Sequence, residues 1–84
     1  MHEVTIYTQP DCYACALVRE WLTTRGIAFT ERDIRADAEA MAAVRAMGAL
    51  STPVTVIGET VVIGFNHRKL ASVLQNESQG VPGR

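Results

Sequence analysis

Two cysteines, Cys12 and Cys15, are the residues of this 84-residue chain whose type and spacing could do chemistry. They enclose the segment Cys-Tyr-Ala-Cys, which follows a strand-like apolar segment at residues 3–7. A dithiol exchange enzyme needs one thiol that attacks and a second thiol within reach of the mixed disulfide. Because a C-x-x-C segment at the start of a helix supplies both, the spacing predicts thiol-disulfide exchange through a redox-active Cys12-Cys15 disulfide, without a bound cofactor.

The expected place of Cys12 at the N-cap of a helix divides the roles of the two thiols. There its sulfur would lie beside the unpaired N–H groups of Ala14 and Cys15, at the positive end of the helix dipole. Such a position lowers the pKa of a cysteine thiol from about 8.5 to roughly 3.5 to 7.5. Cys15 lies one turn further on the same side and is more shielded. We therefore expect Cys12 to attack a substrate disulfide and Cys15 to resolve the mixed disulfide.

Three other uses of the cysteine pair are weighed against this one. The first is chance burial of two cysteines in the core. The second is a zinc site, which takes about four ligands, whereas only His2 and His67 could join the pair, at spacings unlike those of a zinc finger. The third is an iron-sulfur cluster shared between two chains. The alternative function that we keep is a non-enzymatic metal or cluster carrier with Cys12 and Cys15 as ligands, although no bound metal is expected.

Composition and charge restrict the partners and the compartment. The net charge is -1, and no run of Lys or Arg offers a basic face to a phosphate backbone. No segment approaches the roughly 18 apolar residues of a membrane span, and the N-terminus lacks the pattern of a signal peptide. We expect a cytoplasmic monomer that binds neither nucleic acid nor a membrane. In the cytoplasm a C-x-x-C pair is more often catalytic or metal-binding than structural.

The first half of the chain predicts the elements that position the cysteines. Residues 3–7 predict an inner strand, because they are rich in β-branched and aromatic types. Apolar residues at helical spacing then predict a helix that starts at the cysteine pair and ends at Gly26. Residues 27–34 form a second strand candidate, and Asp37 is the expected N-cap of a second helix that ends at Gly48.

The second half predicts a hairpin and a last helix. Residues 54–57 and 60–63 flank Gly58-Glu59, a loop that favours a tight type II′ turn. Asn66 is the expected N-cap of a helix in which Phe65 could pack on Leu70. The order βαβαββα predicts an α/β protein with a thioredoxin-like fold, a four-stranded mixed sheet with three helices. We expect one domain over residues 1–75 and a flexible tail over residues 76–84.

A second candidate constellation is Ser51-Thr52-Pro53-Val54, just before the third strand. Sequence alone favours an ordinary proline before a strand. In the predicted fold, however, this loop faces the cysteines, and a cis Pro53 would present the backbone of Thr52 to an extended substrate. We expect Thr52 and Pro53 to bind substrate. Tyr13 should be exposed between the cysteines, where it could stack on a partner or simply be solvated.

Over residues 3–75 the chain resembles the glutaredoxin-like proteins, including the NrdH redoxins. Three segments carry the resemblance: Tyr7-Thr8-Gln9-Pro10-Asp11-Cys12-Tyr13-Ala14-Cys15, Ser51-Thr52-Pro53-Val54 and Ile63-Gly64-Phe65-Asn66. The resemblance implies a thioredoxin fold, a cis peptide bond at Pro53 and dithiol reductase activity. It also implies that Gly64 and Phe65 take part in substrate binding.

The departures from the family pattern bear on the electron donor. Glutaredoxins usually carry a Lys where this chain has Gln9, and acidic residues where it has Asn66-His67. In the family these charges hold the carboxylate and amino group of glutathione. The Gly64-Phe65 pair resembles NrdH redoxins, which take electrons from thioredoxin reductase. The expected donor is therefore thioredoxin reductase or glutathione, and the expected substrates are disulfide-containing proteins or small molecules, with ribonucleotide reductase a candidate by resemblance.

Overall fold

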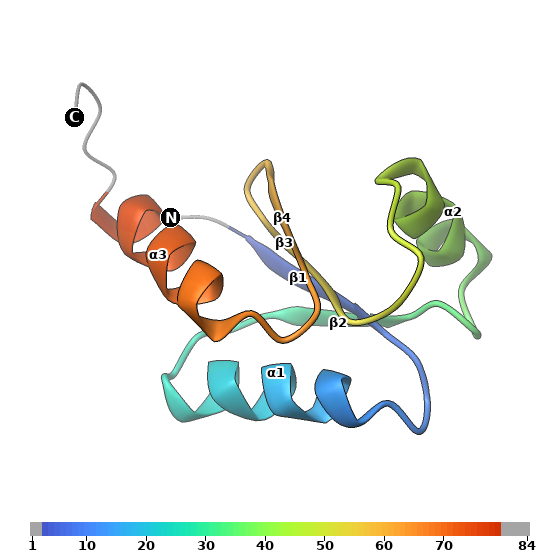
Figure 1. Cartoon of the computed structure of the whole chain (residues 1–84), viewed down its shortest axis with the longest axis horizontal. Helices are drawn as coiled ribbons and strands as arrows, with labels where there is room; N and C mark the ends of the chain where they lie inside the picture. Colours follow the sequence, from blue (N-terminus) through green and yellow to red (C-terminus); the bar gives the residue numbers. More distant parts are fainter. Residues whose placement is uncertain (1–2, 80–84) are drawn as a thin grey trace.

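The computed structural model describes residues 3–79, in which a mixed sheet separates one helix from two others (Figure 1). Within these residues the elements are, in chain order, β1 (Val4–Thr8), α1 (Tyr13–Thr24), β2 (Thr30–Asp33), α2 (Ala38–Ala46), β3 (Val54–Ile57), β4 (Thr60–Ile63) and α3 (His67–Gln79). This is the predicted order βαβαββα. The predicted four-stranded mixed sheet with three helices is therefore confirmed.

The central position of β1 in the sheet brings the two candidate segments together. The strand order is β2-β1-β3-β4. β1 runs parallel to β2, which α1 connects to it, and antiparallel to β3. Tyr7, near the end of β1, pairs with Val54, the first residue of β3. The chain that leaves β1 toward Cys12 therefore starts beside the Thr52-Pro53 segment that leads into β3.

Two apolar clusters, one on each face of the sheet, hold the helices in place. Neighbouring residues of β1 point to opposite faces, and accordingly Ile6 belongs to one cluster and Tyr7 to the other. The buried members of the first cluster, shared with α1 and α3, are Val4, Ile6, Val18, Leu22, Ile57, Val62 and Leu70. Those of the second, shared with α2, are Tyr7, Ile34, Ala40, Val44, Ala49 and Val54. The sheet is thus covered by α1 and α3 on one face and by α2 on the other.

Local side-chain chemistry fixes the turns that the sequence predicted. Both N–H groups at the start of α2 donate to the carboxylate of Asp37, at 3.0 Å from Glu39 and 3.2 Å from Ala40. Gly58 has a φ of 60°, whereas Glu59 has no positive φ, as a type II′ hairpin turn requires. The predicted cap at Asn66 is also confirmed, because its Oδ1 accepts the N–H of Lys69 at 3.1 Å.

The second strand is shorter than predicted, because only Thr30–Asp33 pair with β1. The apolar residues ahead of it, Ile27 and Phe29, pack instead against the cluster under α1 and α3. Their hydrophobicity therefore reflects burial beside a helix rather than strand pairing.

The last helix is longer than predicted, since α3 continues beyond Gln75 to Gln79. The predicted frayed tail is wrong for residues 76–79, because a polar last turn needs no apolar face to stay helical when it extends an existing helix. Residues 80–84 of that tail lie outside the described residues. None of the helices within residues 3–79 has the length and apolar character needed to cross a bilayer.

Candidate active site

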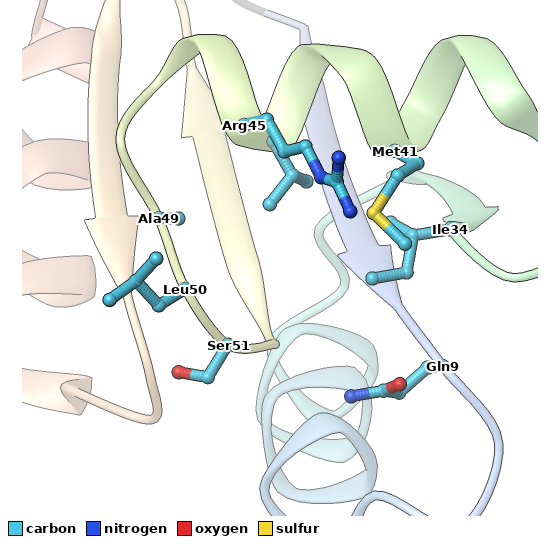
Figure 2. A pocket seen from close by; sticks show the side chains of 8 residues that line it. Gln9, Ile34, Met41, Arg45, Ala49, Leu50 and Ser51 are labelled. Atoms are coloured by element: carbon cyan, nitrogen blue, oxygen red, sulfur yellow. The ribbon is translucent and has the colours of Figure 1, made fainter.

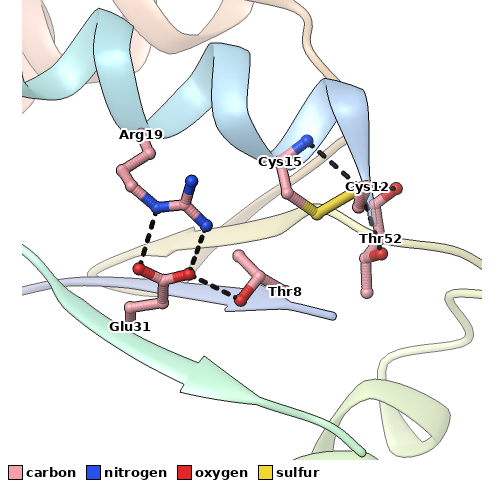
Figure 3. Close-up of polar contacts among 6 residues, drawn as sticks. All are labelled: Thr8, Cys12, Cys15, Arg19, Glu31 and Thr52. Carbon is pink, nitrogen blue, oxygen red and sulfur yellow. Dashed lines mark hydrogen bonds and ion pairs between the residues drawn. A yellow bond between two sulfur atoms is a disulfide. The ribbon is translucent and has the colours of Figure 1, made fainter. Parts of the chain in front are cut away.

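Cys12 and Cys15 are joined by a disulfide at the start of α1, with their Cα atoms 5.2 Å apart (Figure 3). Cys12 is the N-cap, in the extended conformation that an N-cap residue adopts, and α1 begins at Tyr13. Cys12 is half-buried, whereas Cys15, on the first turn, is fully buried. The predicted placement of the pair at the helix start is confirmed, and so is the greater shielding of Cys15.

The sulfur of Cys12 caps the helix. The backbone N–H of Cys15 donates to Cys12 Sγ at 3.1 Å. The prediction placed the sulfur beside the N–H groups of Ala14 and Cys15, and the hydrogen bond is made by Cys15. When Cys12 is reduced, this donor and the positive end of the helix stabilise the thiolate more than the neutral thiol.

A turn of unusual backbone geometry delivers Cys12 from β1 to α1. Asp11 has a φ of 60° and is the non-glycine residue with positive φ among the described residues. Aspartate tolerates this left-handed conformation better than most residues, because its short polar side chain can bond locally. The reversal at Asp11 turns the chain so that Cys12 faces the segment before β3.

The segment before β3 contacts the sulfur of Cys12. The Thr52-Pro53 peptide bond is cis, as the family resemblance implied. The hydroxyl of Thr52 lies 3.6 Å from Cys12 Sγ, and the carbonyl oxygen of Thr52 lies 3.8 Å from the same atom. Because a disulfide sulfur carries no proton, the carbonyl can accept a hydrogen bond from Cys12 only when Cys12 is a thiol.

Gln9 belongs to this site, although the sequence analysis gave it no role. Its Nε2 donates to the hydroxyl of Thr52 at 3.0 Å. Gln9 directly follows β1, and the family position that it occupies is the one where a Lys was expected. That position was a signal that the side chain lies at the site, but the sequence held no indication that it bonds to Thr52.

The other predicted substrate-binding residues lie at different distances from the sulfur. Tyr13 is 79% exposed beside Cys12. Gly64 is tied to the Thr52-Pro53 segment, because its N–H donates to the carbonyl of Pro53 at 2.8 Å. Phe65 packs against the apolar cluster under α1 and α3 and lines a shallow depression with Trp21. The structure thus gathers Tyr13, Thr52 and Pro53 around Cys12, whereas Phe65 lies along the side of α1.

Two clefts meet at Gln9. The first, of about 550 Å³, is open and runs along the active-site turn and α1. Its lining residues are Gln9, Pro10, Asp11, Cys12, Tyr13, Ala16 and Arg19. The second, of about 310 Å³, lies below α2, and Figure 2 shows Gln9 and Ser51 at one end of it and Arg45 and Met41 reaching in from α2. Leu50, at its edge, is fully exposed.

An ion pair beside the site ties α1 to the edge of the sheet (Figure 3). Glu31 accepts hydrogen bonds from Arg19 at 2.6 and 3.0 Å and from the buried Thr8 at 2.8 Å. The hydrogen bonds from Arg19 are the main reason that the pKa of Glu31 lies below its usual value; burial opposes the shift, and the bond from Thr8 adds to it. The sequence analysis had no partner for Arg19, which the structure pairs across the groove between α1 and β2.

No group of three or more potential metal ligands of the His, Cys, Asp and Glu types occurs within residues 3–79. His2, one of the two histidines considered as a zinc ligand, lies outside the described residues. In the structure the sulfurs of Cys12 and Cys15 are bonded to each other. A metal would bind the pair only after the disulfide is reduced, because thiolates are the ligands.

The comparisons with known proteins point to one family. The glutaredoxin family model matches residues 4–62. The glutaredoxin-like protein NrdH of Lactococcus lactis subsp. cremoris is 33% identical over 70 residues, which are 83% of this chain and 97% of that protein. The protein of the same name from Escherichia coli is 34% identical over 62 residues, 74% of this chain and 76% of the relative.

Solved structures agree with the sequence comparisons. The NrdH-redoxin from Escherichia coli, described as a glutaredoxin-like protein with a thioredoxin-like activity profile, has a TM-score of 0.80 and 30% identity, with 84% of this chain and 93% of that chain covered. The crystal structure of a thioredoxin-like protein has a TM-score of 0.80 and 38% identity, with 86% of this chain and all of that chain covered. The predicted thioredoxin-like fold is therefore confirmed.

Proposed function

Since this chain belongs to the glutaredoxin family, with a redox-active Cys12-Cys15 disulfide as its active site, we propose that it reduces protein disulfides and is itself reduced by thioredoxin reductase. As a glutaredoxin-like dithiol-disulfide oxidoreductase it exchanges disulfides through its C-x-x-C pair. The proposal assigns the two roles within that pair, the class of substrate and the electron donor.

The observation that carries the proposal is the difference between the two sulfurs. Cys12 is half-buried at the N-cap and receives the N–H of Cys15, whereas Cys15 is fully buried within the first turn. An attacking thiol must be ionised and accessible, and a resolving thiol need only reach the first sulfur. Cys12 meets the first requirement and Cys15 the second.

The exchange proceeds in two displacements. The thiolate of Cys12 attacks one sulfur of the substrate disulfide, whose S–S bond breaks; the departing sulfur leaves as a thiolate and takes a proton from water. Cys15 gives up its proton to solvent and attacks Cys12 Sγ, which releases the second substrate sulfur as a thiol and forms the Cys12-Cys15 disulfide. Two electrons have then moved to the substrate. A thioredoxin reductase would return two electrons from NADPH and regenerate the dithiol.

A protein substrate fits the surface around Cys12 better than a small thiol does. Two large apolar side chains stand in solvent near the site, Tyr13 at 79% exposure and Leu50 fully exposed. The backbone N–H of Thr52 has no backbone partner within residues 3–79, so it is available to an extended peptide. Such a peptide could pair with the backbone of Thr52 in the manner of an added strand.

The charges at the site favour thioredoxin reductase over glutathione as the donor. The position where glutaredoxins place a Lys is Gln9, an uncharged amide already bonded to Thr52. The positions of the acidic residues that would hold the amino group of glutathione are Asn66 and His67. The NrdH-redoxin relative with a thioredoxin-like activity profile supports the same donor. Ribonucleotide reductase is the first protein substrate to test, because NrdH proteins are the relatives found.

A paired assay tests the proposal. NADPH oxidation is followed on insulin disulfides in the presence of thioredoxin reductase, and separately with glutathione and glutathione reductase, with Cys12→Ser as the blank in both. We expect turnover with thioredoxin reductase and little above the blank with glutathione. Turnover with glutathione alone would overturn the assignment of the donor. Stoichiometric zinc or a visible cluster chromophore in the purified protein, without turnover in either assay, would favour the metal or cluster carrier.

A further inference from the structure

We propose that Gln9 is a positioning residue that directs the hydroxyl proton of Thr52 toward the sulfur of Cys12 and so stabilises its thiolate. The inference rests on the proposed role of Cys12 as the attacking thiol. It adds a residue that acts through Thr52 rather than on the sulfur itself.

Three side chains from three different elements form a line that ends at the sulfur. Gln9 follows β1, Thr52 precedes β3, and Cys12 caps α1. Gln9 Nε2 lies 3.0 Å from Thr52 Oγ1, and Thr52 Oγ1 lies 3.6 Å from Cys12 Sγ. The second distance is within the range of a hydrogen bond to sulfur, which is longer than one to oxygen.

The hydrogen-bonding capacity of a hydroxyl turns this line into a directed one. A threonine hydroxyl has one proton to donate and two lone pairs that accept. The N–H of Gln9 occupies a lone pair, and an amide nitrogen cannot accept the hydroxyl proton in return. The proton of Thr52 is thereby left for the neighbouring acceptor, which in the reduced protein is the thiolate of Cys12.

The direction of this proton matters because Thr52 presents two groups with opposite preferences. Its carbonyl oxygen, 3.8 Å from Cys12 Sγ, can accept a proton only from the neutral thiol and repels the thiolate. Its hydroxyl, at 3.6 Å, favours the thiolate when it donates. Gln9 holds the hydroxyl in the donating orientation. The thiolate then has two donors, Thr52 and the N–H of Cys15 at 3.1 Å.

The experiment measures the pH profile of Cys12 alkylation in the fully reduced protein, with iodoacetamide as the probe and peptide mass spectrometry to locate the label. The variants are Gln9→Ala, Thr52→Val, the double variant and Thr52→Ser. Gln75→Ala, on the exposed surface of α3, is the matched control for loss of a glutamine. Urea unfolding of each variant accompanies the profile, so that a general loss of structure is recognised.

The expected midpoint for Gln9→Ala lies about half a pH unit higher than for the unsubstituted protein, which is about a threefold slower reaction below the midpoint. Thr52→Val should raise the midpoint by up to about one unit, because a hydrogen bond to a charged group is lost. Since Gln9 acts through Thr52, the double variant should match Thr52→Val. Thr52→Ser keeps the hydroxyl and should retain the original midpoint.

Three results would overturn the inference. One is an unchanged midpoint in Gln9→Ala. Another is a lower midpoint in that variant, as expected if the amide oxygen of Gln9 instead drew the hydroxyl proton away from the sulfur. The third is a double variant whose shift is the sum of the two single shifts. Labelling at Cys15 in the unsubstituted protein would instead contradict the proposed function, so failure of the inference and failure of the function are separate outcomes.

Discussion

The backbone N–H of Cys15 donates to Cys12 Sγ at 3.1 Å, so the resolving residue holds the attacking sulfur through its main chain as well as through the disulfide. This contact survives any substitution of the Cys15 side chain, because the donor is a backbone group. The two functions of Cys15, as resolving thiol and as hydrogen-bond donor, can therefore be separated by mutation.

Replacing Cys15 with Ser should trap a mixed disulfide between Cys12 and a substrate. The thiolate of Cys12 is still stabilised by the N–H at position 15, but no second thiol is present to release the substrate. Cys12→Ser should reduce disulfide exchange to the uncatalysed rate. A non-reducing gel and the intact mass after incubation with a disulfide-containing protein measure both outcomes, and two variants equally inert in every assay would argue against the assigned roles.

Thr55→Val should stabilise the protein by about 1 kcal/mol, because a buried hydroxyl without a partner costs desolvation energy that a methyl group does not. Thr55 is fully buried on β3, paired across the sheet with Ile6 and Val62. Its hydroxyl has no hydrogen-bond partner within the described residues. The free energy of unfolding in urea measures the change.

Thr55→Ser is the matched control for that substitution. It keeps the hydroxyl and removes the methyl group, so it should destabilise the protein by about 1 kcal/mol. A Thr55→Val variant less stable than the original would mean that the hydroxyl does contribute a favourable interaction.

Glu31→Gln should remove part of the acid sensitivity of the fold. The pKa of Glu31 is lowered in the folded protein, chiefly by the hydrogen bonds from Arg19. A carboxyl with a depressed pKa stabilises the fold above its unfolded value, about 4.3 for Glu, and this stabilisation is lost as the pH falls through the lower folded value. Because the side chains of Arg19 and Glu31 are 42% and 33% exposed, the contribution is modest and weakens with salt.

Urea unfolding between pH 7 and pH 3 measures this dependence. Glu31→Gln should show a smaller loss of stability than the original protein below about pH 4.3. Glu20→Gln, an exposed residue on α1, is the control and should leave the slope unchanged. An identical loss in Glu31→Gln and the original protein would contradict the role of the ion pair.

Asp37 combines a helix cap with an ion pair, and two substitutions separate them. One oxygen of Asp37 accepts the N–H groups at the start of α2, and the other accepts from Arg32 at 2.8 Å. Asp37→Asn keeps a capping acceptor and loses the charge, whereas Asp37→Ala loses both. The melting temperature should fall from the original protein to Asp37→Asn and further to Asp37→Ala. Equal melting temperatures for the two variants would mean that the cap contributes nothing.

Local patterns in the sequence were sufficient for most of the fold and for the core of the site. The C-x-x-C spacing after a strand placed Cys12 at the N-cap, because the residue types that start a helix act within one turn. The hairpin loop at Gly58-Glu59 and the caps at Asp37 and Asn66 are likewise local features. Each was predicted because a short segment determines its own conformation.

Features that depend on contacts between distant segments were not predicted. The hydrogen bond from Gln9 to Thr52 joins residues 43 apart in the sequence, and its geometry follows from the register of β1 with β3. The ion pair of Arg19 with Glu31 joins α1 to β2 in the same way. The end of α3 was missed for another reason, since a polar last turn leaves no apolar period to read.

The most direct test of the central claim is to find which sulfur reacts first. The reduced protein is treated with less than one equivalent of iodoacetamide at neutral pH, and tandem mass spectrometry locates the label within the peptide that contains both cysteines. We predict that the label lies on Cys12 in at least about a tenfold excess, because the helix N-terminus and the N–H of Cys15 stabilise its thiolate. A label mainly on Cys15, or shared equally, would contradict the account of Cys12 as the attacking thiol.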